Sequence, residues 1–177
     1  MANLPTLILR HKRENLKKCS LRGLETRSDF QFYTYPGDAL PPLDGYVLLK
    51  VGAPVLTRED ANQGIILIDG TWRLAEKMEK FVGPMEARSL PPHFRTAYPR
   101  KQTACPNPDE GLASIEALYL AYLILGRDTT DLLSHYHWKE AFLNTCRQVF
   151  GSFPSGSLSD STCNRQENIS PLHLSQR

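Results

Sequence analysis

Four consecutive aliphatic residues at positions 65–68 lead directly into Asp69 and Gly70, and this junction constrains the fold more than any other feature of the chain. A short apolar run with polar ends is typical of a strand buried on both faces, as in a parallel α/β sheet. Residues 73–81 place apolar side chains at helical spacing, so we expect a helix after the strand. Open α/β sheets bind ligands beyond the carboxyl ends of such strands. Asp69 and Trp72 therefore stand where a carboxylate and an indole could face a small molecule.

A purely structural interpretation of this junction is equally consistent with position alone. Asp69 or Thr71 could cap the following helix, because Asp and Thr are common N-cap residues. Trp72 would then be a core residue. The choice between the two interpretations depends on the rest of the chain.

The first half of the chain has the pattern of an α/β fold. Apolar runs predict buried strands within residues 4–10 and 45–51, and residues 30–35 alternate aromatic and polar side chains, as in a strand with one wet face. A further short strand is predicted at residues 87–90. Residues 57–60 begin with Thr and end with Asp, the pattern of a capped helical turn.

The second half has a helical pattern. Residues 112–125 predict a strongly apolar helix ended by Gly126, and residues 131–150 carry apolar side chains near helical spacing. The last 27 or so residues are rich in serine and poor in large apolar groups, so we expect them to be disordered. The predicted division is an α/β lobe at residues 1–90, a helical lobe at 91–150 and a tail at 151–177.

Composition places the chain among ordinary globular proteins and argues against a membrane partner. Hydrophobic residues make up 41% of the 177 residues and charged residues 23%. The four cysteines form no C-x-x-C pair and have no metal-ligand spacing, which indicates free thiols in a reducing, cytoplasmic environment. The start of the chain lacks the order of an export signal. The apolar stretch at 111–125 contains Ser114 and Glu116 and is too short to span a bilayer.

Positive charge is concentrated in two segments, although the net charge is only +2. Residues 10–27 hold seven Lys or Arg against Glu14 and Glu25, and residues 88–101 hold four and no acid. Two basic segments around a candidate site favour a docked polyanion, with solvated surface charge as the alternative. Tyr33, Tyr35 and Tyr98 add possible stacking platforms for bases. The candidate contacts to nucleic acid are Arg10, Lys12, Arg13, Lys17, Lys18, Arg22, Arg95, Arg100 and Lys101.

Several blocks, in this order, resemble a family of RNA-modifying enzymes. The blocks lie at residues 17–20, 56–60, 66–72, 88–91, 114–117 and 132–143. Together they resemble the ribosome-biogenesis aminocarboxypropyltransferases that modify small-subunit rRNA, which are relatives of the DTW-domain enzymes that modify tRNA uridine. The resemblance covers roughly residues 5 to 150, and no single block is specific by itself.

The resemblance implies both a fold and a reaction. It implies a SPOUT-like α/β lobe with a mostly parallel, knotted sheet, followed by a helical lobe that completes a cleft for S-adenosylmethionine. In that family the cleft buries the methyl group of this donor and exposes its 3-amino-3-carboxypropyl arm, so the arm is transferred to RNA. The acceptor would be a nitrogen of uridine or of a pseudouridine derivative.

The resemblance also assigns site residues. Asp69 would accept the proton of the acceptor nitrogen, because desolvation at the strand end makes it a better base, or would orient the base through a hydrogen bond. Trp72 would stack on the cationic donor. The residues implied to line the donor site are Leu48, Leu49, Trp72, Leu90, Pro91, Ser114, Glu116 and Ala117.

Other residues have simpler explanations. His135 and His137 are two residues apart, which on a helix points them in different directions, so we expect no metal site there. Trp138 and Phe142 are expected in the core. The chain departs from the family at residues 10–13, where the family has an acidic, cysteine-containing string. For the oligomeric state, we slightly favour a monomer over a dimer.

Three alternatives to rRNA aminocarboxypropyl transfer remain open at this point. The first is transfer to a tRNA uridine, since the sequence at residues 69–72 is close to the DTW motif of the tRNA-modifying branch. A methyltransferase of the same knotted fold would expose the methyl group of the donor instead of the arm. A non-catalytic RNA-binding assembly factor would retain the cleft without the reaction.

Overall fold

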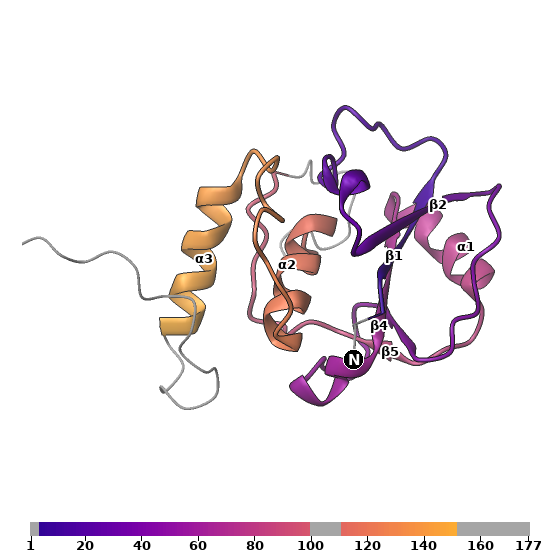
Figure 1. Ribbon diagram of the computed structural model, residues 1–177. Helices are drawn as coiled ribbons and strands as arrows, with labels where there is room; N and C mark the ends of the chain where they lie inside the picture. Colours follow the sequence, from indigo (N-terminus) through magenta and orange to yellow (C-terminus); the bar gives the residue numbers. More distant parts are fainter. Residues whose placement is uncertain (1–3, 100–110, 152–177) are drawn as a thin grey trace, which may run out of the picture.

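One parallel sheet forms the centre of the computed structural model, which describes residues 4–99 and 111–151 (Figure 1). The strand order is β2-β1-β4-β3-β5, and every paired neighbour is parallel. The strands are β1 (Thr6–His11), β2 (Phe30–Tyr35), β3 (Tyr46–Leu49), β4 (Gly64–Asp69) and β5 (Ala87–Arg88). The helices are the 3-10 helices η1 (Leu24–Thr26) and η2 (Arg58–Asn62), followed by α1 (Trp72–Val82), α2 (Ser114–Leu125) and α3 (Lys139–Gly151). The predicted parallel α/β architecture is confirmed.

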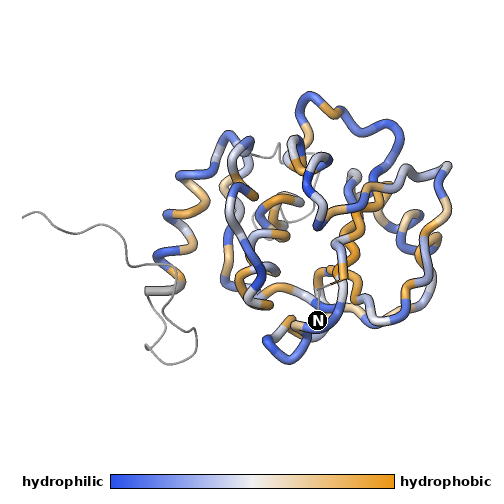
Figure 2. The backbone as a smooth tube through the Cα atoms, viewed as in Figure 1, coloured by the Kyte–Doolittle hydropathy of each residue, from blue (hydrophilic) through white to orange (hydrophobic). Residues whose placement is uncertain are grey.

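Helices cover both faces of the central strands, as the apolar run at 65–68 predicts. Ile8 and Ile65 belong to the core cluster that includes α2, whereas Leu7 and Ile66 belong to a second cluster on the α1 side. Figure 1 shows α1 on one side of the strands, α2 on the other, and α3 beyond α2. Figure 2 shows the hydrophobic residues concentrated along the central strands and α2. Successive strand residues point to opposite faces, which explains the two separate clusters.

The chain leaves β1 and β4 toward opposite faces of the sheet. After β1, the segment 12–29 packs Cys19, Leu21 and Leu24 into the cluster on the α2 side. After β4, the chain enters α1, which covers the other face. Neighbouring strands whose connections diverge in this way leave a crevice at their carboxyl ends, the usual ligand site of an open α/β sheet. In this protein that position lies between β1 and β4.

Local capping agrees with the sequence. Thr57 forms a capping box, in which its backbone N–H donates to Asp60 Oδ2 at 2.9 Å and its side chain accepts from the N–H of Glu59. Arg88 of β5 donates from Nε to Asp60 Oδ1 at 3.0 Å, which fixes η2 to the edge of the sheet. Gly126 ends α2 with φ 68°, a left-handed conformation that favours glycine.

The predicted helix at 131–150 is wrong in its first third. Turns occupy the segment before Lys139, where α3 begins. Asp131 has φ 60°, and a left-handed residue cannot lie within a right-handed helix. Leu132, Leu133 and Tyr136 are nevertheless buried, so the apolar spacing reports burial and not helix. His135 and His137 therefore lie in turns, and the helical argument about their directions does not apply.

Within residues 4–99 and 111–151, no helix is both long and apolar enough to cross a membrane. The same residues contain no cluster of three His, Cys, Asp or Glu side chains able to hold a metal ion.

Glu116 of α2 joins this helix to the loop that precedes residue 100 and to the turns before α3. Its side chain is fully buried and accepts four hydrogen bonds. The donors are the backbone N–H of Ala113 at 2.7 Å, the N–H of Ala97 at 2.8 Å, Thr96 Oγ1 at 2.6 Å and the Tyr136 hydroxyl at 2.8 Å. A buried carboxylate is tolerated only with such saturation.

We predict that Glu116→Gln lowers the free energy of unfolding by about 2–3 kcal/mol, since the amide group turns one acceptor into a donor that faces other donors. Chemical denaturation of both proteins measures the difference. Glu140→Gln, at an exposed position on α3, is the matched control and should change stability by less than about 0.5 kcal/mol. Equal stability of Glu116→Gln and the wild type would contradict the role assigned to this carboxylate.

Candidate functional site

Asp69 ends β4 on the face that α2 covers, where the sheet topology leads us to expect the ligand crevice between β1 and β4. Ser114 Oγ, from the first residue of α2, donates to Oδ1 at 3.0 Å. Arg10 Nε, from β1, donates to Oδ2 at 3.0 Å, and Cys19 Sγ donates to the same oxygen at 3.3 Å. Asp69 is only 5% exposed. One carboxylate thus joins β4, β1, the segment after β1 and the start of α2.

The surroundings of Asp69 differ from the prediction of a bare, desolvated carboxylate. The guanidinium of Arg10 supplies an opposite charge, and three donors occupy most of the acceptor capacity of the carboxylate. The structure therefore favours a carboxyl group held in place by its three donors over a base with free oxygens.

Arg10 is not an exposed contact for RNA, which corrects the sequence prediction. It lies opposite Asp69 in the parallel register of β1 and β4. Its side chain is 12% exposed, pairs with Glu25 Oε1 at 2.9 Å and lies over the Phe32 ring at 4.5 Å. Burial opposes the charge, yet the hydrogen bond to Glu25 and the nearby anions raise the pKa of Arg10 above its usual value. The guanidinium is an internal counter-ion of the site.

Cys19 is a protonated donor and not a nucleophile. Burial, followed by the negative charge of Asp69, raises the pKa of the Cys19 thiol to about 12. The next residue, Ser20, accepts a hydrogen bond from the N–H of Ile115 at 3.4 Å. The block at 17–20 is therefore fixed by two consecutive side chains, since Cys19 bonds Asp69 of β4 and Ser20 bonds the first turn of α2.

The predicted donor-site residues divide between the two faces of the sheet. Leu49 and Leu90 pack against the cluster that contains α2, on the side of Asp69. Leu48 is buried in the other cluster, on the side of α1. Adjacent strand residues point in opposite directions, so only Leu49 of this pair can share a wall with Asp69. Leu48 and Leu49 therefore face opposite sides of the sheet, and their donor contacts stay predictions.

The remaining predicted donor contacts have different outcomes. Ser114 contacts Asp69 directly, and Ala117 and Pro91 are partly exposed. Glu116 has no exposed surface and directs its oxygens to protein donors, so the contact predicted for it is replaced by a positioning role. Trp72 is the first residue of α1, but its side chain lies outside the described part of the structure, and its contact stays a prediction.

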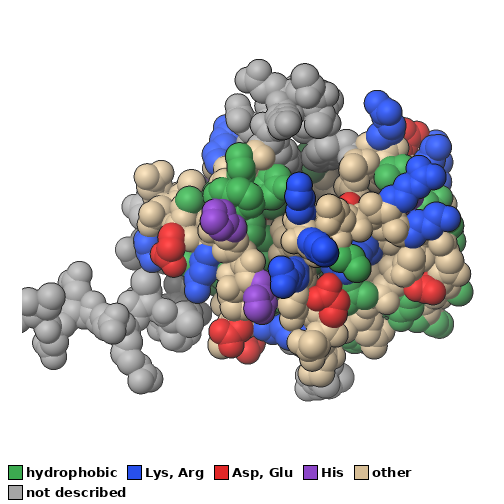
Figure 3. All heavy atoms as spheres, turned by 90° about the horizontal axis from the view of Figure 1, so that it is seen from above, with side chains coloured by type: hydrophobic (Ala, Val, Ile, Leu, Met, Phe, Trp, Pro, Cys, Tyr) green, Lys and Arg blue, Asp and Glu red, His purple; other side chains and the backbone are tan. Residues whose placement is uncertain are grey.

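Most of the predicted basic contacts are exposed. Figure 3 shows Lys and Arg side chains spread over the face seen from above, with fewer acidic ones between them. The exposed members of the predicted set are Lys12, Arg13, Lys17, Lys18, Arg22 and Arg95. Arg100 and Lys101 lie outside the described residues. Of the three predicted stacking platforms, Tyr35 packs against Phe81 and Tyr98 packs edge-on against Trp138, while Tyr33 donates to Gln31 Oε1 at 3.0 Å.

Glu14 is an acidic neighbour of Asp69 that the sequence interpretation did not select. It lies three residues beyond β1, where its N–H donates to the carbonyl of His11 at 2.9 Å. Burial, followed by the negative charge of Asp69, raises the pKa of the Glu14 carboxyl. The signal in the sequence is a single acid within the basic run at 10–18. Such an acid is easily assigned to charge balance on a surface.

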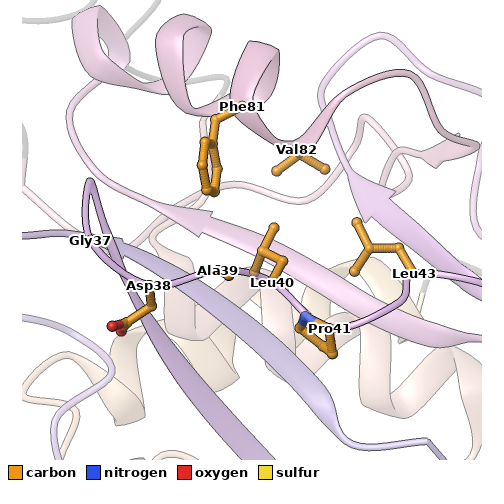
Figure 4. A pocket seen from close by; sticks show the side chains of 8 residues that line it. All are labelled: Gly37, Asp38, Ala39, Leu40, Pro41, Leu43, Phe81 and Val82. Carbon is orange, nitrogen blue, oxygen red and sulfur yellow. The ribbon is translucent and has the colours of Figure 1, made fainter.

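A hollow of about 470 Å³ lies elsewhere, between the loop after β2 and the end of α1. Figure 4 shows Phe81 and Val82 of α1 facing Leu40 and Leu43 of the loop. None of its lining residues belongs to the group around Asp69. Its lining is mostly aliphatic and aromatic, with Asp38 as its acidic member.

Comparison with known proteins gives one structural match. No family model and no curated protein matches the chain. A solved structure described as the S-adenosylmethionine-dependent rRNA:acp-transferase Tsr3 from Vulcanisaeta distributa is similar, with a TM-score of 0.61 and 23% sequence identity. The match covers 83% of this chain and 80% of that one. This likeness establishes a shared fold over most of both chains.

We predict that Asp69→Asn accelerates alkylation of Cys19 at pH 8–9, because loss of the neighbouring negative charge lowers the pKa of the thiol. Peptide mass spectrometry after timed exposure to iodoacetamide measures the rate at each cysteine. Cys146 is the control, since its thiol is also buried, with a pKa of about 11, but Glu116 and not Asp69 acts on it. Acceleration at both cysteines would indicate general opening and contradict the local charge effect.

Proposed function

We propose that this protein transfers the 3-amino-3-carboxypropyl group of S-adenosylmethionine to a nitrogen of uridine or a pseudouridine derivative in small-subunit rRNA. The observation that carries the proposal is the shared fold with an S-adenosylmethionine-dependent rRNA:acp-transferase over 83% of the chain. The crevice at Asp69 supports it, since its position is the one at which open α/β sheets bind ligands. A knotted, SPOUT-like connection belongs to the same proposal and is supported by the insertion of β4 between β1 and β3.

The residues around the crevice fit a cationic donor with an apolar substituent. Asp69 supplies a negative charge whose position is fixed by Arg10 and Ser114. A fixed anion in a weakly solvated site stabilises a nearby cation more strongly than water does. Leu49 and Leu90 offer apolar surface on the same side of the sheet. Such surface can enclose a methyl group without any polar contact.

When bound, the donor supplies a sulfonium whose substituents are all open to attack, and the enzyme selects one by presenting it to the acceptor. The protein needs to bury the methyl group, to leave the arm accessible, and to receive a proton from the acceptor nitrogen. Asp69 is proposed to act by its fixed charge and by positioning Arg10, Cys19 and Ser114. This role fits its saturated oxygens better than proton abstraction does.

The proposed acceptor surface is the basic segment that follows β1. Lys12, Arg13, Lys17 and Lys18 are exposed, and the same segment supplies Cys19 to the crevice. Lys and Arg contacts to phosphates provide most of the affinity for nucleic acid without reading sequence. A chain segment that holds both RNA and Asp69 would bring the acceptor nucleotide to the donor.

We expect purified protein to transfer radiolabel from donor labelled in the carboxypropyl arm, and not from donor labelled in the methyl group, to small-subunit rRNA from cells that lack the gene. Nucleoside mass spectrometry identifies the product. Transfer of methyl label would favour a methyltransferase, and labelling of tRNA alone would favour the tRNA-modifying reaction. Absence of both transfer and donor binding would favour a non-catalytic assembly factor and refute the proposed reaction.

We predict that Lys17→Glu combined with Lys18→Glu weakens RNA binding about tenfold or more and reduces its dependence on salt, since two phosphate contacts are lost. Donor affinity, measured by calorimetry, should change little. Fluorescence anisotropy with labelled rRNA fragments at several salt concentrations measures the effect. Lys139→Glu, exposed at the start of α3, is the control. An unchanged salt dependence in the double variant would remove this segment from the RNA surface.

A further inference from the structure

We propose that Glu25 is a positioning residue of the transfer reaction, and that it acts on Asp69 through Arg10. This role rests on the proposed function and deepens it, because it links Asp69 to the segment expected to hold RNA. Glu25 lies in η1, and its side chain is 41% exposed. The guanidinium of Arg10 stands between this exposed carboxylate and the buried one of Asp69.

Arg10 bonds the two carboxylates with different nitrogen atoms. Its Nη1 donates to Glu25 Oε1 at 2.9 Å, and its Nε donates to Asp69 Oδ2 at 3.0 Å. Since the N–H groups of a guanidinium are held in one rigid plane, a bond at Nη1 restricts the direction of the N–H at Nε. The Phe32 ring also packs on this guanidinium, whose Cζ lies 4.5 Å from the ring centroid. Glu25 therefore constrains the donor that faces Asp69.

Glu25 is itself held by the backbone of the turn before η1. The N–H of Gly23 donates to Glu25 Oε2 at 2.8 Å, so each carboxylate oxygen has a donor of its own. Gly23 has φ 93°, a left-handed conformation that favours glycine, and an added Cβ would overlap the imidazole of His135. The backbone that orients Glu25 thus depends on a glycine and on contact with the turns before α3.

The negative charge of Glu25 lies in a segment where RNA binding would not place it. Residues 10–27 contain seven Lys or Arg, and an acid among them weakens the attraction of phosphates. Burial opposes ionisation of Glu25, yet hydrogen bonds from backbone N–H groups and from Arg10 hold the pKa of this carboxyl below its usual value. The pairing with Arg10 explains why an anion is kept at this position.

The protein contains a second group of the same kind, which provides a matched comparison. Arg88 donates from Nε to Asp60 Oδ1 at 3.0 Å and from Nη2 to Glu86 Oε1. As at Arg10, one largely buried arginine bonds a buried aspartate and an exposed glutamate. This second group fixes η2 to β5, and none of its three residues donates to Asp69 in the described part of the chain.

Glu25→Gln keeps the size of the side chain and removes its charge. The amide turns one of the two acceptor oxygens into a donor, which then faces the N–H of Arg10 or of Gly23. Arg10 loses its fixed partner and holds Asp69 less precisely, so we expect transfer to be slower by a factor of about 10 to 10² at saturating donor and RNA. Glu25→Asp, which keeps the charge, should recover part of this rate.

RNA affinity distinguishes positioning from an effect of surface charge. Removing an acid from the basic segment leaves the attraction of phosphates equal or stronger, so Glu25→Gln should bind RNA at least as tightly as the wild type. Slower transfer without weaker RNA binding is the signature of a positioning role. Single-turnover transfer to small-subunit rRNA measures the rate, and fluorescence anisotropy measures the affinity. Glu86→Gln, which releases the comparable arginine, is the control and should transfer at the wild-type rate.

A double-mutant cycle tests the route through Arg10. In Arg10→Lys an ammonium cannot hold both carboxylates in one plane, so adding Glu25→Gln should slow transfer by less than about twofold, against about tenfold or more in the wild type. Equal losses in the two backgrounds would mean that Glu25 acts by another route and would overturn the inference. Wild-type transfer by Glu25→Gln, or a loss of RNA affinity in proportion to the loss of rate, would overturn it as well.

Hydrogen exchange of the Arg10 Nε–H, followed by NMR, tests the coupling without any transfer. This proton is protected while it bonds Asp69, so Glu25→Gln should accelerate its exchange and Glu86→Gln should not. Unchanged exchange in Glu25→Gln would overturn the inference even if the proposed reaction is correct. Failure of the wild type to transfer the arm to any RNA would refute the reaction itself, and the exchange result would stand apart from it, so the two failures are distinguishable.

Discussion

The ion pair between Arg10 and Asp69 is the interaction on which the rest of the site depends. It joins two adjacent parallel strands at their carboxyl ends, at the point where the chain diverges to opposite faces. Two largely buried charges are costly unless other groups complete their hydrogen bonds. Glu25, Cys19 and Ser114 complete them. Completing the hydrogen bonds of this ion pair therefore holds the segment after β1 and the start of α2 at the crevice.

Much of the fold could be predicted because it depends on local patterns. Short apolar runs gave the buried strands, and Gly126 gave the end of α2, since a left-handed residue there favours glycine. The segment before α3 failed because burial without helix produces similar spacing at Leu132, Leu133 and Tyr136. Nothing local distinguished the two cases. The deciding feature is the left-handed backbone conformation of Asp131.

The site could be predicted in position but not in its charge pairing. The end of β4 identified Asp69 directly from the sequence. The partnership with Arg10 depends on the register between strands 59 residues apart, which no local pattern contains. Without that register, Arg10 looks like one more member of a basic run, and Glu14 looks like its neutralising neighbour. The side of the sheet that Leu48 faces could not be predicted either. A strand of four residues does not show which of its sides the core helix covers.

The distribution of charge separates the two molecules that a transfer reaction must bring together. Around the crevice, Asp69 and Glu25 pair with the guanidinium of Arg10 and Glu14 adds a nearby negative charge, so the acidic groups there favour a cation. Outside it, the exposed side chains of Lys12, Arg13, Lys17 and Lys18 favour a polyanion. A donor that carries a sulfonium and an acceptor that carries phosphates are then attracted to opposite sides of one boundary. Since the donor loses its charge as the bond forms, the interior attraction weakens after transfer, which favours release of the thioether while the RNA is still held.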